Sequence, residues 1–111
     1  MLNDRLIKTT AEVTAAIKES REYADFMEQK KLACANPEAR SLIERARSLQ
    51  SRFMDIPEEE RSNDYAESLQ NEYEEITENT AVYDYLRAEV IYMTMIQEVL
   101  GSIIEHVDID I

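Results

Sequence analysis

The longest amphipathic pattern in the chain covers residues 81–107. Apolar side chains recur there at steps of three, four and seven, which place them on one face of an α-helix. The residues of this face are Val82, Leu86, Val90, Met93, Leu100, Ile103 and Val107. A second apolar set widens the face, and it consists of Tyr85, Tyr92, Ile96, Val99 and Ile104. A helix this broadly apolar is expected to be covered from more than one side, by the rest of the chain and by a second subunit.

Shorter helices are predicted before this long one. Their apolar spacing places them at about residues 4–19, 21–35, 37–55 and 64–77. The third is the most regular, because its apolar residues alternate steps of three and four as in a coiled-coil seam: Ala39, Leu42, Ala46, Leu49, Phe53 and Ile56. Pro57 ends it, since the residue before a proline is disfavoured in helical geometry. Residues 58–63 form a charged connector.

The predicted helix starts carry residues that can cap them. A side-chain oxygen of Asn or Ser accepts a hydrogen bond from a first-turn N–H that has no partner within the helix. The predicted caps are Asn3, Ser20, Asn36 and Asn79. Pro37 directly after Asn36 suits the first helical position, where its missing N–H is not needed.

The composition indicates a fold made only of helices. The chain of 111 residues has one Gly and two Pro, and it shows no sustained alternation of apolar and polar residues. We therefore expect a single all-α domain over residues 1–111, an irregular array of four to five helices with a long C-terminal amphipathic helix. Residues 108–111 are expected to form a frayed tail.

The charge argues against direct nucleic-acid binding. Twenty-four acidic residues against twelve basic ones give a net charge of −12, whereas binding to phosphates requires cations. Residues 55–78 hold one Arg against ten acids, which fits a solvated surface or, alternatively, a docking surface for a basic partner. The N-terminus lacks the features of a signal peptide, and charged residues interrupt residues 81–107, which excludes a membrane span. A cytoplasmic location is expected.

No catalytic, metal or cofactor site is predicted from the residues. Cys34 is the only cysteine and is expected to be a small buried group, with a shared-cluster ligand or redox thiol as the alternative. His106 is the only histidine, and it lacks the Glu-x-x-His spacing of di-iron bundles, so it is expected to face solvent near a helix C-terminus. Glu89 interrupts the apolar face of the last helix, so it is expected to pair with an Arg or Lys or to lie at the edge of that face.

Three stretches resemble the YlbF/YmcA family. They are Glu19-Ser-Arg-Glu-Tyr-Ala-Asp-Phe-Met-Glu-Gln-Lys, Asn36-Pro-Glu-Ala-Arg-Ser-Leu-Ile and Asn79-Thr-Ala-Val-Tyr-Asp-Tyr-Leu-Arg-Ala-Glu, and the likeness extends over about residues 3–107. It implies a helical cytoplasmic adaptor, not an enzyme, that associates with itself or other family members and with ribonuclease Y. Such adaptors influence competence, biofilm formation and sporulation through messenger-RNA processing. Some complexes of the family carry cysteine-held iron–sulfur clusters, but Cys34 alone cannot supply four ligands, so no cofactor is carried over.

The expected partner surface lies on the last helix. Tyr83, Arg87, Tyr92 and Met95 are the interface candidates, because Tyr, Met and Arg are suited to protein interfaces. Phe26 and Phe53 are expected in the core.

Other classes remain open at this stage. A self-associating YheA-like protein without a role in RNA processing would share the architecture. A secreted helical hairpin of the WXG type is disfavoured because the chain has no Trp. A small enzyme is disfavoured because the sequence shows no Gly-rich loop, metal-ligand cluster or nucleophile–base pair.

Overall fold

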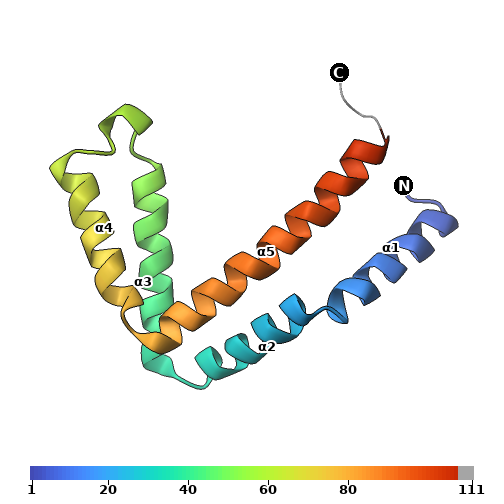
Figure 1. Cartoon of the computed structure of the whole chain (residues 1–111), viewed down its shortest axis with the longest axis horizontal. Coiled ribbons are helices and arrows are strands. Elements are labelled where there is room, and N and C mark those ends of the chain that lie inside the picture. The colour runs from blue at the N-terminus through green and yellow to red at the C-terminus, as the bar shows by residue number, and fades with distance from the viewer. Residues whose placement is uncertain (108–111) are drawn as a thin grey trace. The chain divides into compact units, whose positions relative to one another are not determined.

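The computed structural model describes residues 1–107, and within them the fold is all-α (Figure 1). Its helices are α1 (Asp4–Lys18), α2 (Arg21–Cys34), α3 (Pro37–Met54), α4 (Asp64–Thr77) and the long α5 (Thr80–Val107). A short 3₁₀ turn, η1 (Glu58–Glu60), lies in the connector between α3 and α4. The predicted helices and fold class are confirmed. The predicted frayed tail, residues 108–111, lies outside the described residues.

All the predicted caps form. The carbonyl oxygen of the Asn3 side chain accepts from the Leu6 N–H at 2.8 Å, and the hydroxyl of Ser20 accepts from the Tyr23 N–H at 3.1 Å. Asn36 and Asn79 cap α3 and α5 in the same way. A cap that the sequence reading did not include is Asn63, whose side chain accepts from the Ala66 N–H at 2.8 Å and starts α4. The start of each α-helix is therefore set by a hydrogen bond between residues only three apart in the sequence.

The end of α3 is held by Arg61 from the connector. Its guanidinium donates to the carbonyl oxygens of Ile56 (3.1 Å) and Met54 (3.3 Å), and it lies 5.6 Å from the centroid of the Phe53 ring. Carbonyls at a helix C-terminus lack helical partners, so a cation here satisfies them. The connector is thus tied to the helix that it leaves.

The chain divides into two compact units. Gln29–Arg87 contains the end of α2, then α3, η1, α4 and the start of α5. The second unit combines Met1–Glu28 with Ala88–Ile111, described as far as Val107.

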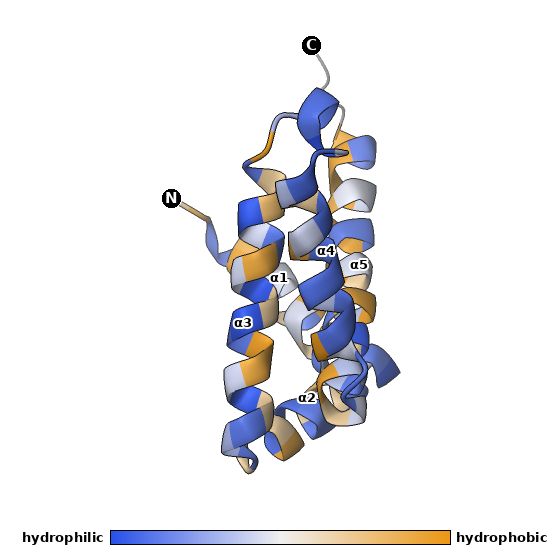
Figure 2. Ribbon diagram, turned by 90° about the vertical axis from the view of Figure 1, so that its left-hand side faces the viewer, coloured by the Kyte–Doolittle hydropathy of each residue, from blue (hydrophilic) through white to orange (hydrophobic). Residues whose placement is uncertain are grey.

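Every buried residue of the described chain belongs to the unit Gln29–Arg87. These residues are Ala33, Ala39, Ile43, Ala46, Leu49, Ile56, Ala66, Leu69, Ile76, Val82, Tyr85 and Leu86. All of them except Ala33 in α2 and Ile56 after α3 come from α3, α4 and the start of α5. Apolar and polar residues alternate along the ribbons of these helices (Figure 2). Helices α3 and α4 pack along each other, and the small side chains of Ala46 and Ala66, both 0% exposed, suit close helix packing.

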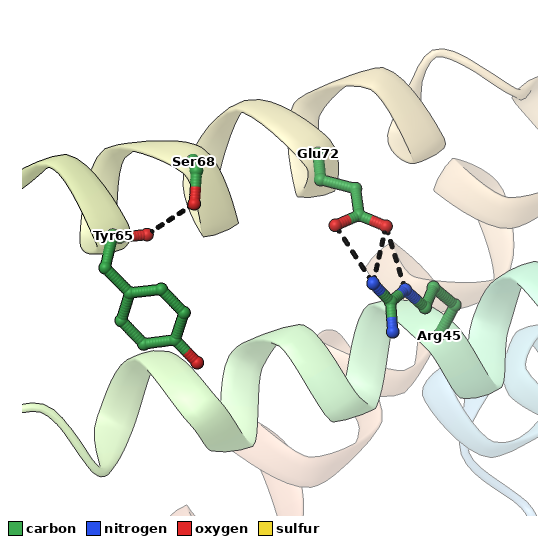
Figure 3. Close-up of polar contacts among 4 residues, drawn as sticks. All are labelled: Arg45, Tyr65, Ser68 and Glu72. Atoms are coloured by element: carbon green, nitrogen blue, oxygen red, sulfur yellow. Dashed lines mark hydrogen bonds and ion pairs between the residues drawn. The ribbon is translucent and has the colours of Figure 1, made fainter.

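A charged pair joins the outer sides of α3 and α4. The Arg45 Nε donates to Oε1 of Glu72 at 2.8 Å, and the Arg45 Nη2 donates to Oε2 at 3.1 Å (Figure 3). These hydrogen bonds lower the pKa of the Glu72 carboxyl, against a smaller opposing effect of partial desolvation, and they raise the pKa of Arg45. Both side chains remain about two-fifths exposed, so solvent screens the pair and its contribution to stability is small.

The lowered pKa of Glu72 predicts a pH-dependent difference between wild type and Glu72→Gln. A carboxyl whose pKa falls on folding adds stability above its unfolded pKa of about 4.3 and loses it as the pH falls through the lower folded value. The wild type should therefore be slightly more stable than Glu72→Gln at pH 7, and this difference should shrink progressively as the pH falls below about 4. Urea unfolding at several pH values measures it. A difference that stays constant down to pH 3 would contradict the assignment.

The second unit is held partly by aromatic contacts between α2 and α5. The rings of Phe26 and Tyr92 stack with centroids 5.0 Å apart and planes 13° apart, and Tyr23 meets Tyr92 at 5.9 Å and 58°. No described residue of this unit is buried. Within the described part of one chain, only Val82, Tyr85 and Leu86 of α5 are buried, so the rest of its broad apolar face is not fully covered by the chain itself.

Three side chains expected in the interior lie elsewhere. Cys34 is exposed, because its neighbour Ala33 takes the inward position in the last turn of α2 and the next residue is rotated by about 100°. Phe26 and Phe53 are half-buried: the first stacks on Tyr92, and the second lies beneath Arg61. The predicted burial of all three was wrong.

Candidate protein-binding groove

The unit Gln29–Arg87 contains a partly open groove between α3 and α4, of about 820 Å³. Its walls come from the second half of α3 and the middle of α4. The lining residues are Arg47, Leu49, Gln50, Ser51, Phe53, Met54, Leu69, Gln70, Tyr73 and Glu74. The two helices hold these side chains together because their buried faces are packed on one another.

The groove has an apolar base and an amphipathic rim. Leu49 and Leu69 are buried, so they form the base of the groove. Met54 is 64% exposed at the end of α3, and the half-buried Phe53 is fixed by Arg61 above its ring. Within the groove, the exposed apolar surface is therefore concentrated at the Met54 end.

Polar contacts set the shape of the walls. The Gln50 amide nitrogen donates to the Tyr73 hydroxyl at 3.3 Å and links α3 with α4. The Arg47 Nη2 donates to the hydroxyl of the buried Tyr85 at 3.1 Å, and its guanidinium carbon lies 5.8 Å from the centroid of that ring. Arg47 thus presents a positioned positive charge, and Glu74 on α4 presents a negative one.

This combination suits the binding of another protein. Tyr, Met and Arg are enriched at interfaces, and Met adapts its shape to different contacts. Within residues 1–107, no group of three or more His, Cys, Asp or Glu side chains is placed to hold a metal ion. An amphipathic helix with apolar residues three and four apart could place them on the apolar base and polar residues at the rim.

The four predicted interface residues do not line this groove. Tyr83 and Arg87 are exposed, one helical turn apart on α5, in the unit Gln29–Arg87. Tyr92 and Met95 are half-buried and belong to the other unit, where the Tyr92 ring is stacked on Phe26. The sequence held no direct signal for the groove, because its lining depends on which turns of α3 and α4 lie opposite each other.

The other residues singled out in the sequence lie as follows. His106 is exposed in the last turn of α5, as predicted, with its Nδ1 2.7 Å from the carbonyl oxygen of Ser102. Glu89 is half-buried on α5. No helix in the described part of the chain has the length and apolar character needed to cross a membrane.

The helices and the groove define a small all-α protein with an exposed amphipathic surface. The family model described as "Control of competence regulator ComK, YlbF/YmcA" matches residues 6–108. The chain therefore belongs to the YlbF/YmcA family, which confirms the resemblance read from its three motifs and gives it a regulatory role in the control of competence. No curated protein and no solved structure was found to match the chain.

Proposed function

We propose that this protein is a cytoplasmic, non-enzymatic regulatory adaptor that binds a partner protein through the α3/α4 groove. The partner is ribonuclease Y or a complex that contains it, and binding alters messenger-RNA processing and through it competence, biofilm formation and sporulation. The observation that carries the proposal is the family match over residues 6–108.

The groove supports a partner that presents an apolar helix face. Its buried base would receive apolar side chains, and the exposed Met54 would be covered on binding. Glu74 on the α4 wall belongs to the acidic stretch 55–78, so a partner with basic residues beside its apolar face fits best. The protein then acts by occupying a surface of the ribonuclease. Direct contact with RNA is disfavoured by the net charge of −12.

A variant at the groove rim tests this role. Met54→Glu places a charge where apolar contact is expected, and because Met54 is 64% exposed the substitution should change the stability of the chain by less than about 0.5 kcal/mol. In a host strain that lacks the native gene, Met54→Glu should lower transformation frequency and capture of ribonuclease Y by about tenfold or more relative to wild type.

Leu32→Glu is the matched control. Leu32 is an exposed apolar residue on α2 in the same unit and does not line the groove. It should retain wild-type transformation and capture. Equal behaviour of both variants would contradict the groove as the binding surface. Normal transformation in the strain without any copy of the gene would contradict the regulatory role and favour a self-associating protein of the YheA type.

A further inference from the structure

The connector between α3 and α4 begins at the Met54 end of the groove (Figure 1). It is short and has hydrogen bonds of its own. Pro57 precedes the 3₁₀ turn η1, and the Glu60 N–H donates to the Pro57 carbonyl oxygen at 2.8 Å. Ile56 at the start of the connector is buried. A connector of this kind can keep the neighbouring binding residues in place when it is held against the helix that it leaves.

Arg61 holds the connector against α3 through three contacts. Its Nε donates to the Ile56 carbonyl oxygen at 3.1 Å, and its Nη2 donates to the Met54 carbonyl oxygen at 3.3 Å. Its guanidinium carbon lies 5.6 Å from the centroid of the Phe53 ring. A guanidinium is planar and carries its N–H groups in a rigid fork, so one side chain fixes all three neighbours. A lysine ammonium on a flexible stem cannot reproduce this arrangement.

Two of the residues that Arg61 contacts line the groove. Phe53 is half-buried beneath the guanidinium, and Met54 is 64% exposed. Arg61 contacts Met54 through the backbone carbonyl, so it fixes the last turn of α3 and leaves the Met54 side chain open to a partner. Arg61 does not itself line the groove. It therefore acts on the groove through Phe53 and Met54.

The same contacts direct the one positive charge of the acidic stretch 55–78 toward backbone carbonyls and a ring. The acidic residues of the connector are exposed, and they are Asp55, Glu58, Glu59 and Glu60. The apolar end of the groove is thus followed along the chain by carboxylates. Such an end fits an apolar side chain that has a lysine or arginine beside it on a partner helix.

We propose that Arg61 is a positioning residue of the groove. It fixes the Met54 end in the shape that receives a partner helix with a basic residue next to its apolar anchor. This inference rests on the proposed function, because it concerns how the same groove recognises its partner. It also differs from an effect of charge alone. Loss of Arg61 makes the region more negative and would strengthen attraction to a basic partner, whereas loss of position weakens binding.

Amide hydrogen exchange of the unbound protein tests the positioning without a partner. The Ile56 N–H donates to the Phe53 carbonyl oxygen at 3.1 Å, and in Arg61→Ala it should exchange at least about tenfold faster than in the wild type. Arg52→Ala is the matched control, because Arg52 is exposed in the last turn of α3 and does not line the groove. It removes the same charge and should leave this rate unchanged. An unchanged rate in Arg61→Ala would overturn the proposal.

Capture of ribonuclease Y tests the consequence for binding. Arg61→Ala should capture at least about fivefold less than the wild type, and Arg52→Ala should capture as much as the wild type. Arg61→Lys keeps the charge but not the planar fork, so it should remain weaker than the wild type. Circular dichroism checks that all three variants keep the helix content of the wild type.

Two binding results would overturn the proposal. Undiminished capture by Arg61→Ala would show that the position of the Met54 end does not matter for the partner. Full capture by Arg61→Lys would show that the charge suffices. A wild type that captures no ribonuclease Y would instead contradict the proposed function and with it the binding part of this inference. The exchange rate of the Ile56 N–H would then still decide whether Arg61 shapes the groove.

Discussion

Leu49→Ala is expected to lower the free energy of unfolding by about 2–5 kcal/mol, the range for removing a fully buried leucine side chain. Leu49 is 1% exposed in α3 and is, with Val82, one of the largest fully buried side chains of the described chain. Its removal loses apolar burial and leaves a cavity that the packed α3 and α4 can fill only in part. Against a total stability of about 5–15 kcal/mol, this loss is large. Urea unfolding followed by circular dichroism measures it.

Leu32→Ala separates this effect from a general cost of losing a leucine. Leu32 lies on α2 in the same unit and is 55% exposed, so its truncation should change the free energy of unfolding by less than about 0.5 kcal/mol. Equal losses for Leu32→Ala and Leu49→Ala would show that α3 and α4 do not form the interior of this unit.

Ala46→Leu is expected to destabilise the chain by about 1–3 kcal/mol, for the opposite reason. Ala46 is 0% exposed on the packed face of α3, so three added carbon atoms have no free volume to occupy. They must push α3 away from its neighbours or force strained side-chain rotamers. The same unfolding experiment measures the loss, and a Leu in place of Ala changes helix propensity very little.

Ala81→Leu controls for the added side chain. Ala81 is exposed in the first turn of α5, where a leucine can point into solvent. Its effect should stay within about 0.5 kcal/mol. If Ala46→Leu proved neutral or stabilising, the α3–α4 contact would contain unfilled space and the packing described for Ala46 would be wrong.

These substitutions and those of the proposals probe different parts of the molecule. The core variants act on the interior of Gln29–Arg87, whereas Met54→Glu changes only the exposed end of the groove. Leu49 also lines the groove, so its truncation would mix a loss of stability with a change of shape. Partner binding is therefore better tested at Met54.

The sequence predicted most of the helix boundaries because they depend on neighbouring residues. The cap of Asn36 reaches three residues along the chain, and Pro57 limits the residue directly before it. The repeat of apolar residues in α3 predicted its inward face for the same reason, since a helix of regular pitch carries residues three and four apart on one side. The motifs that begin at Glu19, Asn36 and Asn79 also predicted the family, and the match over residues 6–108 confirms it.

Only the tertiary structure decided which apolar faces are covered. Cys34 and Phe53 lie in helices that the sequence predicted, yet their exposure depends on where neighbouring helices pack. The apolar pattern of one helix does not contain the positions of its neighbours. The groove likewise exists because particular turns of α3 and α4 lie opposite each other. Residues 81–107 show most clearly which features the sequence determined and which the tertiary structure decided. Their pattern determined one long apolar helix, while the packing with α3 and α4 buried only its first turns and left Leu100, Ile103 and Ile104 about half exposed.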